Sequence, residues 1–425
     1  MTTLIWAIIL ILLALLGAPL FAIIAAIALL SFHALGIDTS AVIVEMYRLA
    51  SSPTLIAIPL FTFAGYILAE SKAPKRLVDL SNALFGWLPG GLAIVALVTC
   101  AFFTAFTGAS GVTIVAIGGL LYPILRKEGY TENFSLGLLT SSGSLGLLFP
   151  PSLPIILYAV IAKINIDQLF LAGIIPGFLL IFMLSIYSIR KGIVSKISKT
   201  PFNWKNLFVS LKAAAWEIPL PFIIIGGIYS GFFTATEAAA ITAFYVLIIE
   251  VFFYRDLNLF KDVPRIMKES MVLVGGILVI LGAALGLTNY LIDEQIPMKI
   301  LAFMQNFIGS KIVFLIMLNI LLLIVGCMMD MFSAIIVVVP LIVPIAKEFG
   351  VDPVHLGVIF LANLEIGYFT PPVGLNLFIS SFRFEKPVLK LYVAALPFFL
   401  IYLIALLIIT YVPELSLWLV RLVGN

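Results

Sequence analysis

The stretch SSGSLGLLFPPS at residues 141–152 decides how this chain folds, because a stretch of similar design, ANLEIGYFTPPV, occupies residues 362–373. Each lies inside a long apolar segment and contains two consecutive prolines, which remove backbone N–H donors and break a helix. Inside a membrane, such a break is tolerated only where it is buried in protein or lines a cavity. The two stretches therefore predict two broken helices, at about 134–162 and about 354–382.

A constant shift of 221 positions relates the surroundings of the two stretches as well. Adding 221 brings glycine onto glycine and proline onto proline without a gap, at Gly65 and Gly286, Pro123 and Pro344, Gly129 and Gly350, Gly146 and Gly367, Pro150 and Pro371, Pro151 and Pro372, and Pro176 and Pro397. Repeats of this kind are typical of secondary transporters, which bind their substrates where the two repeats meet.

The composition is that of an integral membrane protein. Hydrophobic residues make up 63% of the 425 residues and charged residues 11%, and the mean hydropathy is +1.23. The net charge of +3 is small and is spread over loops, so we expect no nucleic-acid partner. The two cysteines, Cys100 and Cys327, both lie in apolar stretches and indicate neither disulfides nor a thiolate metal site.

Apolar segments long enough to cross a bilayer recur along the whole chain. Besides the two broken helices, we expect spans at about 4–32, 54–70, 168–190, 216–232, 236–254, 271–291 and 391–412. Two other apolar stretches, about 92–126 and about 312–346, are too long for one span and too short for two, which predicts re-entrant hairpins. Residues 75–87 and 293–307 mix charged and apolar residues, as interfacial arm helices do.

Lysines and arginines sort to one side of this arrangement, which the positive-inside rule assigns to the cytoplasm. The predicted fold is an all-α integral membrane protein with an inverted repeat. The first repeat covers residues 1–190, a connecting loop and extra span cover 191–235, and the inverted second repeat covers 236–425. The N-terminus is predicted to be cytoplasmic and the C-terminus periplasmic.

The tips of the two hairpins carry the next candidate residues. The first tip, residues 104–113, has four hydroxyl side chains and two glycines, which suits a turn that offers oxygen ligands to a hard cation such as sodium. The second tip, residues 326–333, contains Asp330, and the second break contains Glu365. An ionisable group at membrane depth is usually functional, although each acid is also compatible with a structural, helix-capping role.

Polar side chains in the tips and breaks are the candidates for substrate contacts, and they are Ser110, Ser144, Ser152, Asn363 and Asn376. No arginine lies near either break, so we expect neutral donors and bound sodium to hold a substrate carboxylate. No G-x-x-x-x-G-K-[ST] motif is present, so an ion gradient is the expected source of energy.

Four stretches together resemble the large permease (DctM-like) subunit of tripartite ATP-independent periplasmic, or TRAP, transporters. They are IPLF at 58–61 with Ala64 and Gly65, TGASG at 107–111, Gly146 with PPS at 150–152, and TPPVGLNLF at 370–378. The resemblance implies an elevator-type secondary transporter that moves two hairpins and two broken helices against a scaffold. It also implies that the chain is not an enzyme.

Carried over residue by residue, the resemblance implies two or more sodium sites. The first site takes Thr107, Gly108 and Ser110 with Gly143, Gly146 and Pro150, and the second takes Gly326 and Asp330 with Gly367 and Thr370. The first tip departs from the family pattern at Ala109, where small hydroxyl residues are frequent.

The resemblance also implies a setting in the bacterial inner membrane and several partners. These are a small membrane (DctQ-like) subunit, a periplasmic substrate-binding protein, the lipid bilayer, and a small organic anion such as a C4-dicarboxylate or sialic acid. One alternative is a stand-alone divalent-anion/sodium symporter. Another is an intramembrane enzyme, which should carry paired acidic motifs near the cytoplasmic face, an arrangement that Asp330 and Glu365 do not form.

Overall fold

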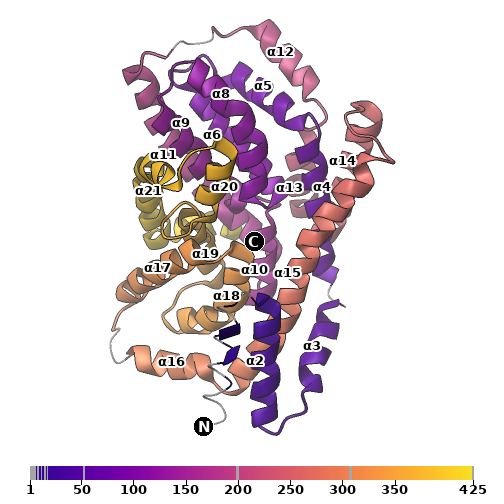
Figure 1. Cartoon of the computed structure of the whole chain (residues 1–425), viewed down its shortest axis with the longest axis vertical. Helices are drawn as coiled ribbons and strands as arrows, with labels where there is room; N and C mark the ends of the chain where they lie inside the picture. Colours follow the sequence, from indigo (N-terminus) through magenta and orange to yellow (C-terminus); the bar gives the residue numbers. More distant parts are fainter. Residues whose placement is uncertain are drawn as a thin grey trace.

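The computed structural model describes residues 18–50, 53–197, 201–305 and 309–423, together with residues 6, 9, 10, 12, 13 and 16. Within these residues the secondary structure is helical throughout, without a strand. Six helices are long and apolar enough to cross a membrane, or seven if the bent pair in residues 132–162 counts as one span. The prediction of an all-α integral membrane fold is confirmed (Figure 1).

The shift of 221 residues relates helices as well as sequence. Helices of the first half are α4 (Ala57–Glu70), α5 (Ala73–Phe85), α6 (Gly91–Thr107), α7 (Ser110–Thr113) with α8 (Gly119–Lys127), α9 (Glu132–Ser142), α10 (Leu153–Ala162) and α11 (Ile166–Val194). Their partners in the same order are the end of α15 (Asp262–Asp293), α16 (Ile296–Gln305), α17 (Lys311–Met328), α18 (Met331–Glu348), α19 (Pro353–Gly367), α20 (Leu375–Phe384) and α21 (Val388–Tyr411). Adding 221 to the first residue of α7 and to the last residue of α8 gives the first and last residues of α18.

Both predicted hairpins are present, and each returns to the side from which it starts. At the base of the second hairpin, the Lys311 ammonium donates to the Gly350 carbonyl at 2.6 Å, and the Phe314 and Phe349 rings stack with centroids 4.5 Å apart. At its tip, α17 and α18 are separated by only Met329 and Asp330. The first hairpin turns at Gly108, whose φ of +62° is a left-handed conformation that glycine adopts readily.

Both broken helices are also present. In the first, α9 continues through the 3-10 turn η3 (Leu145–Leu148) to α10, and the two parts meet at 46°. In the second, α19 ends at Gly367 and α20 begins at Leu375 after an irregular segment. Pro150–Pro151 and Pro371–Pro372 are cis.

A group of helices from both halves of the chain forms a scaffold beside these elements (Figure 1). It consists of α2 (Leu20–Ala34), α3 (Ser40–Ala50), α4, α13 (Pro219–Tyr229), α14 (Ala235–Ile248) with its π-helical end η4 (Ile249–Phe253), and α15. The long α15 packs along α2, α3 and α4. The hairpins touch this scaffold where α6 meets α4 and where α18 meets α15.

Several predicted boundaries differ from the structure. The expected span at 4–32 falls partly outside the described residues, and its described helix, α2, begins only after the extended Pro19. The expected spans 168–190 and 271–291 lie within the longer α11 and α15, whereas 216–232 holds only the 11-residue α13. The chain also forms α3, α12 (Trp204–Ala213) and α22 (Glu414–Val423), which hydropathy alone did not reveal.

A buried charge cluster joins the first arm helix, α5, to the scaffold. The Arg76 guanidinium contacts Glu217, binds Glu250 at 2.9 Å and Asp256 at 2.5 Å, and lies 3.7 Å from the centre of the Tyr254 ring. Burial favours the neutral form of Asp256, but hydrogen bonds from Arg76 and Lys72 outweigh it and lower the pKa of this carboxyl. At the second arm, α16, the described residues form the Glu294–Lys299 pair, in which Lys299 is exposed and Glu294 partly exposed.

Contacts across the fold agree with the predicted sorting of charges to one end. Lys72 binds Asp256, and Arg265 binds Glu70. At the opposite end, the Tyr229 hydroxyl donates to the Asp167 carbonyl. The structure thus brings together the segments that the charge pattern placed on one side, and the assignment of that side to the cytoplasm stays a prediction.

We predict that Gly137→Ala destabilises the protein, because a Cβ at Gly137 would lie 2.1 Å from the Ala394 carbonyl oxygen, where α9 packs against α21. Overpacking of this kind costs about 1–3 kcal/mol. The measurement is the thermal unfolding midpoint of the purified protein in detergent. Gly226→Ala is the control, since a Cβ there meets nothing within 4 Å. Equal midpoints for the two variants would contradict the packing of α9 on α21.

Candidate functional site

The first hairpin tip sits directly on the first break. The Thr104 hydroxyl lies 2.8 Å from the Gly143 carbonyl oxygen, to which it can donate, and 2.7 Å from the Thr113 hydroxyl. Gly146 packs so tightly against α6 that a Cβ there would lie 2.1 Å from the Ala101 carbonyl oxygen. The tip and the break therefore form one packed unit, in which hydroxyl and carbonyl oxygens gather.

The residues predicted to bind sodium at the first tip all lie in this unit. Gly108 ends α6, and its N–H donates to the Thr104 carbonyl at 2.8 Å. The Thr107 hydroxyl is within 3.5 Å of the Ala109 backbone N–H and carbonyl oxygen. Ser110 begins α7 and is 3% exposed. Pro150 follows the η3 turn of the same break.

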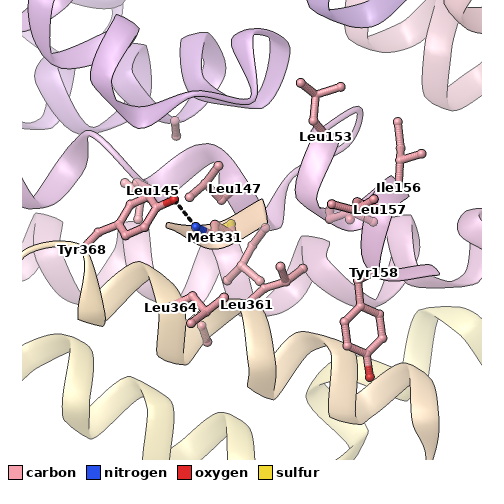
Figure 2. Packing of buried hydrophobic residues seen from close by; sticks show 14 of the residues in the cluster. Leu145, Leu147, Leu153, Ile156, Leu157, Tyr158, Met331, Leu361, Leu364 and Tyr368 are labelled. Carbon is pink, nitrogen blue, oxygen red and sulfur yellow. Dashed lines mark hydrogen bonds between the residues drawn. The ribbon is translucent and has the colours of Figure 1, made fainter. Parts of the chain in front are cut away.

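The second tip packs on the second break in the corresponding way. The Gly374 N–H donates to the Cys327 carbonyl at 3.0 Å, and the Met331 N–H donates to the Tyr368 hydroxyl at 2.7 Å. Gly326 and Gly367 touch through their backbones, since a Cβ on Gly367 would lie 2.3 Å from the Gly326 carbonyl carbon. Figure 2 shows the Met331–Tyr368 bond beside Leu145 and Leu147 of the first break.

Asp330 adopts the helix-capping geometry that was the alternative to a ligand role. Its Oδ1 accepts the N–H groups of Phe332 and Ser333 at 3.0 and 3.1 Å, at the start of α18, and the residue is exposed. Capping engages one carboxylate oxygen, so the geometry does not exclude a second role for the other. The Thr370 hydroxyl donates to the Ile366 carbonyl at 2.6 Å, next to Gly367.

The two breaks cross each other at a pair of residues that the repeat relates. The Ser144 hydroxyl donates to the Glu365 carbonyl at 3.3 Å, and 144 plus 221 is 365. Near this crossing, the Thr140 hydroxyl donates to the Ser380 hydroxyl at 2.9 Å, and the Asn376 amide donates to the Thr140 carbonyl at 3.2 Å. Ser144, Asn376 and Glu365 are fully buried.

The predicted substrate residues are only partly brought together. Ser144 and Asn376 lie at the crossing, and Ser152 starts α10 with a buried hydroxyl that has no hydrogen-bond partner. Asn363 is directed elsewhere, because its amide nitrogen donates to Asn319 at 2.7 Å and to the Ile359 carbonyl at 2.8 Å. The partner Asn319 was missed in the sequence, where a single asparagine in an apolar helix carried no pattern.

The polar atoms of the Asn363 and Asn376 side-chain amides differ in whether they have hydrogen-bond partners. Asn363 and Asn376 both donate hydrogen bonds from their amide nitrogens to protein acceptors. The Oδ1 atom of each is buried and has no hydrogen-bond partner. An unpartnered oxygen attracts a cation and repels a carboxylate. The Asn376 amide keeps a second N–H group, and the substrate-binding role of both asparagines stays a prediction.

The fold and this site together define a class of protein, a multi-pass membrane transporter in which two hairpins and two broken helices of opposite orientation interlock. A solved transporter of this fold is YdaH of Alcanivorax borkumensis, which aligns with a TM-score of 0.62 over 90% of this chain and 88% of that chain, at 14% identity.

The sequence profile of the tripartite ATP-independent periplasmic transporter DctM component matches residues 4–415. The chain belongs to this family. It is 38% identical over 90% of its length, and 89% of the relative, to the C4-dicarboxylate TRAP transporter large permease protein DctM of Pseudomonas aeruginosa. The relatives are permeases, so the chain is a transporter subunit and not an enzyme.

Two other relatives are named for different compounds. The isethionate TRAP transporter permease protein DctMQ of Oleidesulfovibrio alaskensis is 36% identical over 86% of this chain and 58% of its own length. The ectoine/5-hydroxyectoine large permease protein UehC of Ruegeria pomeroyi is 33% identical over 96% of both chains.

We predict that Tyr368→Phe loosens the second tip, because it leaves the buried Met331 N–H without an acceptor. An unsatisfied buried donor costs about 1–3 kcal/mol. Hydrogen–deuterium exchange of peptides covering residues 326–336 should become faster. Tyr392→Phe is the matched control, since it removes a hydroxyl bond to the exposed Pro372 carbonyl on the other side of the break. Unchanged exchange in Tyr368→Phe would show that this bond does not hold the tip.

Proposed function

We propose that this chain is the large membrane subunit of a sodium-coupled, binding-protein-dependent importer of small organic anions. One observation carries the proposal: two oxygen-rich units, each a hairpin tip on a helix break, are related by the repeat and meet at Ser144 and Glu365. Family membership supports the transporter role, and the oxygen-rich units support the sodium coupling.

Each unit offers the kind of ligands that sodium prefers. The first provides hydroxyl oxygens from Thr107 and Ser110 and carbonyl oxygens from the turns and the 3-10 helix η3 around Gly143, Gly146 and Pro150. The second provides the carboxylate of Asp330, the hydroxyl of Thr370 and the carbonyls of Gly326 and Gly367. Neutral oxygens dominate both sets, so a monovalent cation fits them better than a more highly charged ion.

The anion is proposed to bind between the units, beside Ser110, Ser144 and Ser152. The half-helices α10 and α20 begin at the breaks, and their N-termini carry partial positive charge that favours an anion. Ser144 and Ser152 are fully buried and Ser110 nearly so, which means that substrate enters only after the structure opens. The relatives' names support C4-dicarboxylates or sulfonates as substrates to test first.

Opening is proposed to follow an elevator mechanism. The hairpins and broken helices interlock across the repeats, because α10 packs on α18 and α20 packs on α7 and the π-helical turn η2 (Ile114–Gly118). They meet the scaffold where α6 and α10 pack on α4 and where α18 packs on α15, and the contact of α6 with α4 places Gly65 against the Phe106 carbonyl at the first tip. Because these elements interlock with one another, they are suited to move against the scaffold as one unit.

The proposed setting is the bacterial inner membrane, with an N-terminus in the cytoplasm and a C-terminus in the periplasm. The partners are a small membrane subunit, which the name DctMQ of one relative supports, and a periplasmic binding protein, which the family name supports.

The partner requirement gives the test of the proposal. Uptake of radiolabelled succinate and isethionate is measured in proteoliposomes that contain this chain with or without its small subunit and binding protein. We expect accumulation only with both partners and only under an inward sodium gradient. Full-rate uptake by the chain alone would favour a stand-alone symporter. An uptake rate that is the same with and without the sodium gradient would refute sodium coupling.

We predict that Asp330→Asn raises the sodium concentration needed for half-maximal uptake by about tenfold or more, because it removes a carboxylate from a dehydrated cation. An asparagine still caps a helix, so α18 keeps its start. Asp352→Asn is the control, since Asp352 caps α19 through the Val354 and His355 N–H groups in the same manner. An unchanged sodium requirement in Asp330→Asn would make Asp330 a capping residue alone.

A further inference from the structure

Glu365 is a carboxyl group at the centre of the molecule that the proposed sites do not yet use. It is 0% exposed, and neither of its carboxyl oxygens has a hydrogen-bond partner. Its backbone carbonyl accepts the Ser144 hydroxyl of the first break, and it lies two residues before Gly367 of the second break. The side chain is directed toward the Leu148 amide of the first break, without forming a hydrogen bond with it.

Away from the ends of the hairpins and broken helices, no lysine or arginine is present to neutralise this carboxyl. The two hairpins and two broken helices contain no lysine or arginine in residues 92–125, 129–162, 312–346 and 348–382. Tyr402 approaches Glu365 from α21, but its hydroxyl donates to the Ser141 carbonyl at 3.0 Å. The Glu365 carboxyl thus lies near a tyrosine hydroxyl that bonds elsewhere, in a part of the fold that carries no lysine or arginine.

An ionised carboxylate in such a place is costly unless a cation neutralises it. The nearest proposed cations are the sodium ions of the two units, and Glu365 adjoins the breaks of both. Asp330, in contrast, is an exposed residue at the second tip alone. Glu365 belongs to the second break, and its backbone carbonyl accepts the Ser144 hydroxyl of the first break, so the residue lies where the two breaks meet.

We propose that the Glu365 carboxylate is the shared countercharge for sodium ions bound at both breaks. The inference rests on the proposed sodium coupling and deepens it. The carboxylate acts through its field on ions that are held by the surrounding hydroxyl and carbonyl oxygens. Removing the charge therefore weakens sodium binding at both breaks, whereas loss of the Asp330 charge affects the second alone.

Sodium binding is measured directly, without substrate or partners, through thermal unfolding of the purified chain in detergent. A ligand that binds the folded state raises the unfolding midpoint in proportion to the logarithm of its concentration over its dissociation constant. Sodium chloride is varied against choline chloride at constant ionic strength. Glu365→Gln should need about tenfold more sodium, or higher still, for the same stabilisation as the wild type.

Two further variants separate charge from packing. Glu365→Asp keeps the charge on a shorter side chain and should fall between the wild type and Glu365→Gln. Tyr402→Phe removes the buried hydroxyl beside Glu365 without changing any charge, so it should lower the midpoint and leave the sodium requirement unchanged. Should Glu365→Gln fail to fold, Glu365→Met, which also removes the charge at a similar volume, carries the test, and an unchanged sodium requirement there overturns the proposal.

The outcomes distinguish this inference from the proposed function. If sodium fails to stabilise the wild type beyond choline, sodium coupling itself is refuted and the inference falls with it. If sodium stabilises the wild type and Glu365→Gln equally, coupling stands and the countercharge role is wrong. Glu365 would then be a neutral packing group at the crossing of the breaks.

Discussion

The demand that buried backbone groups find partners inside the membrane controls this structure. Two helices break at membrane depth, and the hydrogen-bonding groups released there are met by the hairpin tips. The Gly143 carbonyl receives the Thr104 hydroxyl, and the Gly374 N–H reaches the Cys327 carbonyl. Each break consequently depends on its tip, and glycines at 146, 326 and 367 allow the close approach that these contacts require. The oxygen-rich site follows from the same demand.

The two repeats are equivalent in their helices but not in their chemistry. Asp330 corresponds to Ala109, and Glu365 to Ser144, so both acids of the site come from the second repeat. The arms differ too, but here the first repeat is the more charged one. Arg76 ties α5 into a buried cluster of three carboxylates, whereas in the described part of α16 Lys299 pairs with the partly exposed Glu294. Removing one member of this cluster would leave a buried charge without its partner, which is strongly destabilising. The cluster therefore holds α5 firmly against the scaffold. The two repeats therefore share the same arrangement of helices, and amino-acid differences at corresponding positions determine where the charges lie.

The sequence predicted the hairpins, the breaks and both arms. It could do so because patterns of glycine, proline and hydropathy are local, and the repeat shows each pattern twice. It also identified the tips as oxygen-rich. It missed α3, α12 and α22, whose amphipathic surfaces give no long apolar run. It treated Arg76 only as a marker of topology, since its acidic partners are more than 140 residues away along the chain. The direction of the Asn363 amide toward Asn319 likewise depends on packing of α19 against α17, which no local pattern encodes.

The central claim is that tips and breaks move as one body against the scaffold. Electron paramagnetic resonance distances between spin labels test it most directly. One label pair joins position 226 on scaffold helix α13 to position 396 on α21, which packs on α9, α19 and α20. A second pair joins position 178 on α11, which packs on α6 and α19, to position 396, so both labels of this pair lie on helices that contact the body proposed to move. All three positions are exposed. With the partner subunits present, adding sodium and substrate should change the first distance by several ångströms and leave the second unchanged. A constant first distance, or an equal change in the second, would contradict the account.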